Sequence, residues 1–357
     1  MKTKIFHSLN IFLIIIFILL IDFTFSKIIY KIDHCFNFQY FENGHYYDLR
    51  KNCNSKYRFK SGFPTVNFNT DNLGLRVGDQ IKIKDKSKKN IFIFGDSFTF
   101  GVGLEYENTY AGILEKKMPE YNFYNFAVGS YSPTVHFHRL KQAINSGLTP
   151  DKIILFLDLT DVIDESKRWI FDKNLNLPIR PENRIKDNKK FYKENFKLTY
   201  DLINTMRYGL RVIKDKFKDQ KLTIKTSIQG QFTYTKTEDL DKRFWKKNDF
   251  ERGLNKINSN INKISKLAKR NNAKFYLTVY PWAETLFYGQ KSYNWSNFAN
   301  QICDINDCIT IDAIPLFQKY ALQNENWHSK LYFIGDEHFN KQGAKLLANT
   351  VLQKISK

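Results

Sequence analysis

One short stretch constrains the fold of this chain more than any other: the apolar residues 91–94, followed directly by Gly95, Asp96 and Ser97. A short apolar run that ends in turn residues is typical of a buried strand. Open α/β sheets bind their ligands at the carboxyl ends of their strands. The side chain that this strand presents at that edge is the hydroxyl of Ser97.

The other groups that serine chemistry requires lie far downstream. Asp336 and His338 are separated by one residue in the segment Gly335-Asp-Glu-His-Phe-Asn340. A serine hydroxyl needs a base to take its proton, and the base needs an acid to fix its tautomer. We therefore expect Ser97 to be the nucleophile, His338 the general base and Asp336 the orienting acid.

Strand-like and helix-like segments alternate over much of the chain, which is typical of a parallel sheet with helices on both faces. We expect a three-layer α/β/α sandwich with a mostly parallel, flavodoxin-like sheet. The expected strands are 91–94, 123–126, 152–157 and 274–280. The expected helices are 109–117, 133–146, 200–217, 251–270 and one that begins near residue 341.

The motifs around these strands resemble the SGNH (GDSL-like) hydrolase superfamily of esterases and acyltransferases. Gly95-Asp96-Ser97 is similar to its first block, and Gly335 to Asn340 to its last. The segment from Asn125 to Gly129 is similar to its second block, and the segment from Asn72 to Arg76 to one often found before the first strand of membrane-linked members. The resemblance covers roughly residues 70–160 and 270–357.

The resemblance also implies an oxyanion hole, formed by the backbone amides of Ser97 and Gly129. The superfamily's third block normally places an Asn side chain there as a further donor, but this chain has Thr160 at that position. A hydroxyl is shorter than an amide and can also accept a hydrogen bond. We expect Thr160 to donate weakly or to leave this part of the hole to backbone amides.

The N-terminus predicts export. Residues 5–25 are almost entirely apolar and follow Lys2 and Lys4, and 21 helical residues span about 30 Å, enough to cross a bilayer. We expect residues 1–26 to be a transmembrane signal-anchor, with the bulk of the chain on the periplasmic or extracytoplasmic side. Cleavage after Ser26, which would release the chain as an exported protein, is the alternative. Residues 27–88 are interpreted as an accessory region and 89–357 as the catalytic domain. An insertion at about 164–248 is either a lid or an elaboration of the scaffold.

Four cysteines fit an oxidising compartment. The simplest of the three possible pairings joins Cys35 to Cys53 and Cys303 to Cys308, and four buried thiols are the alternative.

The composition and the remaining motifs exclude several other functions. The net charge of +20 is spread along the chain, so it favours an anionic lipid or glycan surface over nucleic acid. The glycines after residue 94 do not form a dinucleotide fingerprint, and the Gly-x-Ser-x-Gly motif of α/β-hydrolases is absent. We expect no cofactor and no metal, and the isolated histidines His136, His138 and His328 are not interpreted as ligands.

The sequence therefore predicts a membrane-anchored serine esterase that removes an acyl group, possibly from a cell-envelope carbohydrate, through an acyl-enzyme on Ser97. An O-acyltransferase that acts on an envelope polysaccharide would use the same residues. A catalytically idle envelope binding or scaffold protein is the alternative from another class, and Thr160 is its best support. The expected partners are an acylated small molecule or carbohydrate and the membrane.

Overall fold

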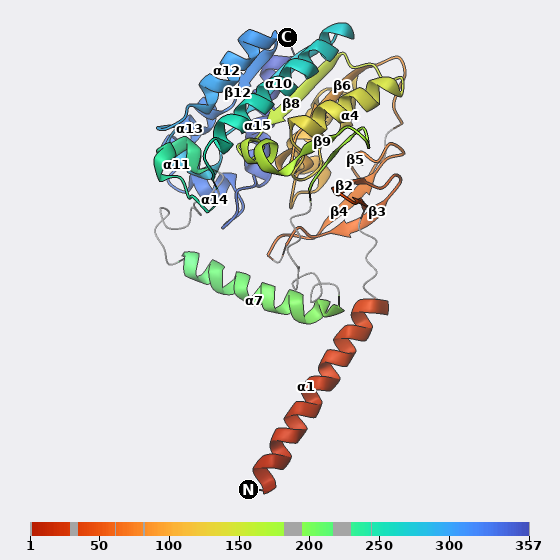
Figure 1. Ribbon diagram of the computed structural model, residues 1–357, viewed down its shortest axis with the longest axis vertical. Coiled ribbons are helices and arrows are strands. Elements are labelled where there is room, and N and C mark those ends of the chain that lie inside the picture. The colour runs from red at the N-terminus through yellow and green to blue at the C-terminus, as the bar shows by residue number, and fades with distance from the viewer. Residues whose placement is uncertain are drawn as a thin grey trace.

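A computed structural model describes residues 2–28, 35–60, 62–80, 83–181, 195–216, 230–243 and 245–356. Its centre is a five-stranded parallel sheet in the order β12-β11-β8-β6-β7 (Figure 1). Counted along the chain within this sheet, the order is the flavodoxin-like 2-1-3-4-5, which confirms the expected fold class. The strands are β6 (Lys89–Phe94), β7 (Tyr121–Asn125), β8 (Lys152–Leu157), β11 (Lys274–Val279) and β12 (Ile309–Asp312).

Helices cover both faces of this sheet. On one face α10 packs against α4 and α12, and on the other α15 packs against α3. The side chains of β8 from Ile153 to Leu157 are fully buried between these layers, as expected for a central strand of a parallel sheet. The bounds are α3 (Tyr110–Lys117), α4 (Pro133–Asn145), α10 (Asp249–Arg270), α12 (Trp295–Asn306) and α15 (Lys341–Ile355).

Shorter elements connect these layers. They are α2 (Ser97–Phe100), α5 (Asp161–Ile163), a π turn (Asp164–Arg168), β9 (Ile170–Asp172), β10 (Leu177–Ile179), α9 (Gln231–Tyr234), α11 (Ala283–Tyr288), α13 (Ile314–Gln323) and α14 (Trp327–Leu331). Single 3₁₀ turns lie at Tyr106–Asn108 and Thr237–Asp239.

Residues 35–77 form two small antiparallel sheets that pack beside the nucleophile end of the large sheet. The first pairs β1 (Phe36–Phe41) with β2 (Gly44–Leu49), and the second has the order β3-β4-β5 (Asn54–Tyr57, Val66–Thr70 and Arg76–Val77). Side chains from these strands share one apolar cluster with residues that follow β6 and β7, among them Phe100 and Val128. The region that was interpreted from sequence as accessory thus contributes to the packing around the site.

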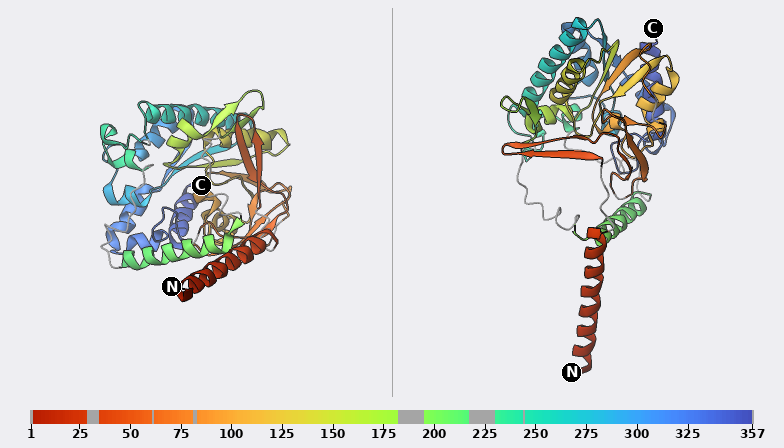
Figure 2. Two further views of the ribbon diagram at one scale, coloured as in Figure 1. Left: turned by 60° about the horizontal axis from the view of Figure 1, so that its bottom comes forward. Right: turned by 90° about the vertical axis from the view of Figure 1, so that its right-hand side faces the viewer.

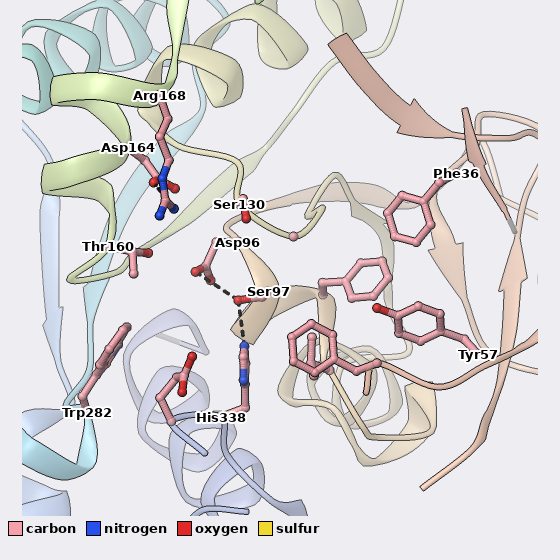
Figure 3. Close-up of a pocket in the computed structure, with 15 residues that line it drawn as sticks. Phe36, Tyr57, Asp96, Ser97, Ser130, Thr160, Asp164, Arg168, Trp282 and His338 are labelled. Atoms are coloured by element: carbon pink, nitrogen blue, oxygen red, sulfur yellow. Dashed lines mark hydrogen bonds and ion pairs between the residues drawn. The ribbon is translucent and has the colours of Figure 1, made fainter. Parts of the chain in front are cut away.

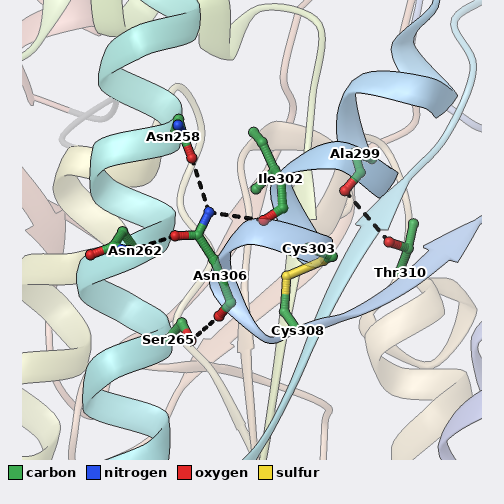
Figure 4. The surroundings of a disulfide bond; sticks show 9 residues. All are labelled: Asn258, Asn262, Ser265, Ala299, Ile302, Cys303, Asn306, Cys308 and Thr310. Carbon is green, nitrogen blue, oxygen red and sulfur yellow. Dashed lines mark hydrogen bonds between the residues drawn. A yellow bond between two sulfur atoms is a disulfide. The ribbon is translucent and has the colours of Figure 1, made fainter.

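Two disulfides join the cysteines in the expected pairs, Cys35 with Cys53 and Cys303 with Cys308. The second closes the turn between α12 and β12, and Asn306, the last residue of α12, is held against α10 (Figure 4). Its side chain donates to Asn258 Oδ1 at 2.9 Å and accepts from Asn262 Nδ2 at 2.6 Å. The disulfide and these amide contacts fix the edge strand to the helix layer.

Two long helices lie apart from the sheet. Helix α1 (Lys2–Ile28) projects away from the rest of the molecule, and α7 (Lys197–Lys216) lies across its end, on the side of the catalytic body (Figures 1 and 2). The segment Leu9–Lys27 is long and apolar enough to cross a membrane, with a mean hydropathy of 2.5, and a signal sequence has the same properties.

Candidate active site

Ser97 begins the short helix α2 directly after β6, at the carboxyl edge of the sheet. The carboxylate of Asp96 caps this helix by accepting the backbone N–H of Phe98 at 3.0 Å. Gly101 ends it with a φ of +80°, a left-handed conformation that glycine adopts readily. This tight strand–turn–helix geometry holds the Ser97 hydroxyl at the surface of a cavity.

The loop before α15 brings His338 and Asp336 to Ser97 (Figure 3). His338 Nε2 lies 2.8 Å from Ser97 Oγ, and His338 Nδ1 lies 2.5 Å from Asp336 Oδ1. Asp336 Oδ1 also accepts the backbone N–H of His338 at 3.0 Å, which fixes the loop. The three residues that the sequence singled out as nucleophile, base and acid are therefore in hydrogen-bond contact, in the order that serine catalysis requires.

Buried charges favour proton transfer along this line. Burial lowers the pKa of His338, but the hydrogen bond and the charge of Asp336 outweigh it and raise the pKa above its usual value. Burial raises the pKa of Asp336, but its hydrogen bond to His338 and the positive charges of His338 and Lys60 hold it well below the usual range. Asp336 thus stays ionised and stabilises the imidazolium that forms when His338 accepts a proton.

Asp96 is the second carboxyl group near the nucleophile. Burial and the charge of Asp158 raise the pKa of Asp96 well above its usual value. Its Oδ2 lies 3.4 Å from Ser97 Oγ, farther than the 2.8 Å that separates Ser97 Oγ from His338 Nε2. The shorter distance to Ser97 Oγ makes His338 the better placed base.

Ser97 and Gly129, whose backbone amides are expected to form the oxyanion hole, both line the same cavity. Within the described residues, the N–H groups of Ser97 and Gly129 donate to no protein acceptor. A Cβ added at Gly129 would lie 3.9 Å from Ser97 Cβ, so a side chain there would project toward the nucleophile. Tyr47 Oη donates to the Gly129 carbonyl at 2.9 Å, and Trp169 Nε1 donates to the Ser130 carbonyl at 2.7 Å, which together fix this loop.

Thr160 also lines the cavity, but its hydroxyl is engaged elsewhere. Thr160 Oγ1 donates to Asp158 Oδ1 at 2.5 Å, and its backbone N–H donates to the same oxygen at 2.7 Å. The other oxygen of Asp158 accepts from Trp282 Nε1 at 2.8 Å and from Tyr280 Oη at 3.1 Å. The structure therefore places Thr160 beside the nucleophile with its one proton directed to a buried carboxylate.

Three residues from the small N-terminal sheets and the loop between β3 and β4 support the site and were not identified from the sequence. Lys60 Nζ forms an ion pair with Asp336 Oδ2. The ring of Phe59 packs edge-on against His338, with 5.4 Å between ring centroids, and Tyr47 holds the Gly129 loop. Residues 35–65 have no long periodic pattern, so no local signal identified these contacts.

Arg76 fixes the end of α2, the helix that begins with the nucleophile. Its guanidinium is fully buried and donates to the carbonyls of Phe100, Gly101 and Leu104. The first two of these carbonyls belong to the end of α2. Arg76 lies in the segment that the resemblance indicated before the first strand, although its role was not predicted.

The cavity above Ser97 has a volume of about 200 Å³ and two unlike walls (Figure 3). The wall on the side of the small sheets is mainly aromatic and consists of Phe36, Tyr57, Phe59, Phe100 and Val102. The opposite wall is mainly polar and consists of Ser130, Thr160, Asp164, Arg168 and Trp282. Asp164 and Arg168 belong to the stretch expected to be an insertion, and they form an ion pair of 2.6 Å.

The donors near the site do not favour a metal ion. Asp336, Glu337 and His338 offer ligand atoms within 4.8 Å of one another. However, His338 and the cationic Lys60 already bind the two oxygens of Asp336. Elsewhere, His136 and His138 are buried on α4, where burial lowers the pKa of His136 to about 3 and that of His138 to about 4.

No family model and no curated protein matches this sequence. Solved structures are similar in fold at low identity. An acetyl xylan esterase, AlAXEase, is 15% identical, with 74% of this chain and 99% of that chain covered and a TM-score of 0.43. TesA is 10% identical, with coverage of 74% and 97% and a TM-score of 0.40. A member of the lipolytic G-D-S-L family from Veillonella parvula DSM 2008 is 11% identical, with coverage of 75% and 99% and a TM-score of 0.42.

Proposed function

We propose that this protein is a serine esterase that forms an acyl-enzyme on Ser97. The observation that carries the proposal is the unbroken line of hydrogen bonds from Ser97 Oγ through His338 to Asp336, at 2.8 and 2.5 Å. His338 takes the proton of Ser97 as its oxygen attacks the ester carbonyl, and then gives that proton to the departing alcohol. Water, deprotonated by the same imidazole, releases the acid and restores Ser97.

The negative charge on the carbonyl oxygen is stabilised by the backbone N–H groups of Ser97 and Gly129. Preorganised donors of this kind act without reorganisation when the charge develops. Because Thr160 Oγ1 donates to Asp158, the hole is built from backbone donors, and the side-chain donor of the usual third block is not replaced.

The two walls of the cavity suit the two halves of an acylated carbohydrate. The aromatic wall suits the apolar acyl group, and the volume of about 200 Å³ suits a short one. The polar wall, with Asp164 and Arg168, suits the hydroxyl groups of a sugar. The proposed substrate is therefore an O-acyl group on a carbohydrate of the cell envelope.

We further propose that α1 remains attached as a membrane anchor. Asp22 and Ser26 near its end are buried, with 2% and 7% of their surface exposed, and both accept backbone N–H groups of α7. Cleavage after Ser26 would remove these acceptors from the chain. The two disulfides agree with a catalytic body outside the cytoplasm.

The test is turnover of p-nitrophenyl acetate by the full chain, beside the variants Ser97→Ala and His338→Ala. Each variant should lose turnover by on the order of 10⁴-fold or more, because a nucleophile and its base act as one unit. A Ser329→Ala variant, which changes an exposed serine outside the cavity, should keep full activity. Equal turnover by the full chain and both site variants would contradict the proposal.

A serine-reactive fluorophosphonate probe separates the remaining alternatives. Labelling of Ser97 without hydrolysis of simple esters would favour an O-acyltransferase, in which a sugar hydroxyl replaces water in the second step. Absence of both labelling and turnover would favour a binding or scaffold protein.

A further inference from the structure

Helix α7 carries an apolar stripe that no described part of the chain covers. Its members recur every three or four residues, as on one face of an amphipathic helix. Each has between 42% and 68% of its surface exposed: Leu198, Leu202, Ile203, Met206, Leu210 and Ile213. Such a stripe is unfavourable in water, so it indicates a surface that covers it.

The beginning of α7 is attached to the end of α1. Asp22 accepts the N–H groups of Leu198 at 3.0 Å and of Thr199 at 2.8 Å, and Ser26 Oγ accepts that of Lys197 at 2.9 Å. These are the amides that a helix leaves without partners inside its own first turn. Two polar residues near the end of α1 thus act as the N-terminal cap of a helix about 170 residues away in the sequence.

The orientation of α7 follows from its contact with the catalytic body. Tyr208 packs on the loop at Gly62, where an added Cβ would lie 2.4 Å from the tyrosine ring. Successive residues of a helix turn by about 100°, so Met206 and Leu210 point about 160° away from Tyr208. The apolar stripe therefore faces away from the body, on the side opposite the contact with Gly62.

The charge of α7 suits an anionic surface. The helix has five lysines and arginines against two aspartates, and the whole chain has a net charge of +20. An apolar stripe with basic residues on the same helix is typical of helices that lie in the plane of a membrane. Figures 1 and 2 show α7 crossing the end of α1, at the level where α1 would leave the bilayer.

We propose that α7 is an in-plane membrane helix, whose apolar stripe enters the boundary between headgroups and acyl chains of the bilayer that α1 spans. This inference rests on the proposed anchor. It also sets the height of the active site, because the loop that meets Tyr208 carries Phe59 and Lys60, which contact His338 and Asp336. The catalytic loop is then held a short distance from the lipid surface.

The test uses the full chain in vesicles that contain phosphatidylglycerol. All four native cysteines are paired, so one added cysteine can carry a fluorescent label. Met206→Cys reports the stripe, and Asn204→Cys, a partly exposed residue about 160° from Met206 around the helix, is the matched control. Leu13→Cys reports insertion of α1. Each label is exposed to a lipid-borne nitroxide quencher and to aqueous iodide, and p-nitrophenyl acetate turnover is measured in the same vesicles.

The expected result is that the nitroxide quenches the Met206 label several-fold more than the Asn204 label, and that iodide shows the reverse order. Lipid quenching at Leu13 with iodide quenching at Met206 would overturn the inference and leave the anchor intact. Protection of the Met206 label from both quenchers, together with a disulfide-linked dimer of unlabelled Met206→Cys, would overturn the inference. That result would favour a second copy of the chain as the partner of the stripe. Iodide quenching at both Leu13 and Met206 would contradict the proposed anchor as well as this inference. Turnover reports on the esterase independently of all these outcomes.

Discussion

At the scale of single residues, Lys60 sets the electrostatics of the proposed base. Its ammonium group contacts Asp336 and partly neutralises the charge that stabilises a protonated His338. The pKa of His338 already lies above its usual value. Since His338 must be neutral to accept the proton of Ser97, turnover should fall as the pH decreases through this raised pKa.

Removing the Lys60 charge should shift this dependence. In Lys60→Met the imidazolium is stabilised more strongly, so the acidic limb of the kcat/KM profile should move to higher pH. The side chain of Lys60 is 43% exposed, so solvent screens the effect and the shift should be small. Lys56→Met, which removes an exposed charge from β3, should leave the profile unchanged. A profile of Lys60→Met that coincides with that of the native chain would contradict this role.

Thr160 gives a second prediction at this scale. If the hole is formed by the amides of Ser97 and Gly129 alone, an added side-chain donor should strengthen it, since one donor is typically worth about 100- to 1,000-fold in rate. Thr160→Asn should therefore raise kcat by more than a factor of a few. Thr160→Val removes only the hydroxyl that donates to Asp158. Its kcat serves as the comparison for Thr160→Asn. A smaller change in Thr160→Asn would show that backbone donors already saturate the hole.

At the scale of elements, the nucleophile helix depends on a strand that precedes the large sheet. Arg76 in β5 donates to three carbonyls around the end of α2, and its guanidinium packs over the rings of Phe68 and Phe100. Burial lowers the pKa of Arg76 to about 10, which still leaves it charged at neutral pH.

Replacing Arg76 should destabilise the fold and the site together. Arg76→Leu leaves buried carbonyls without donors, and each such group costs about 1–3 kcal/mol. The melting temperature should fall by several degrees, and the fraction of Ser97 that a fluorophosphonate labels should fall with it. Arg58→Leu, at an exposed position, should change neither quantity. An unchanged melting temperature in Arg76→Leu would show that water replaces the guanidinium.

Sequence patterns predicted the elements that carry strong local signals. The run 152–157 coincides with β8. An uninterrupted apolar run suits a central strand of a parallel sheet, because both faces of such a strand are buried. The expected helix 200–217 begins three residues earlier in the structure, at Lys197. Its cap comes from Asp22 and Ser26 of α1, and a cap supplied from so far along the chain leaves no local signal.

The same reasoning applies to the candidate site. The sequence predicted that Ser97, Asp336 and His338 act together because each lies in a recognisable motif. Lys60, Phe59 and Tyr47 were missed because their contacts depend on how the small sheets pack against the large one. Asp164 and Arg168, from the stretch expected to be a lid or an elaboration of the scaffold, line the cavity.

At the scale of the whole molecule, the small sheets and the large sheet should unfold together. The apolar cluster that joins them includes Phe36 and Phe68 on one side and Val128 and Trp169 on the other, and the Cys35–Cys53 disulfide restrains the N-terminal part. A disulfide that closes a loop of this length is worth about 3 kcal/mol.

Removal of this disulfide should therefore lower the stability of the entire body. Cys35→Ser/Cys53→Ser should reduce the midpoint of denaturant unfolding and keep a single transition, followed by tryptophan fluorescence and by esterase activity. Two separate transitions would show that the N-terminal part unfolds alone. The Cys303→Ser/Cys308→Ser variant provides the comparison, because that disulfide closes a much shorter loop between residues five positions apart.

The distance along the chain between the partners of the site has a consequence for synthesis and export. Ser97 and His338 are 241 positions apart, and Lys60 and Asp336 are 276 positions apart. Contacts between such distant residues form late, because a very long loop must first be closed. On the proposed export route, a chain that is still crossing the membrane has its serine but not yet its base, so it cannot cleave esters along that route. Catalytic competence requires the segment that carries Asp336 and His338.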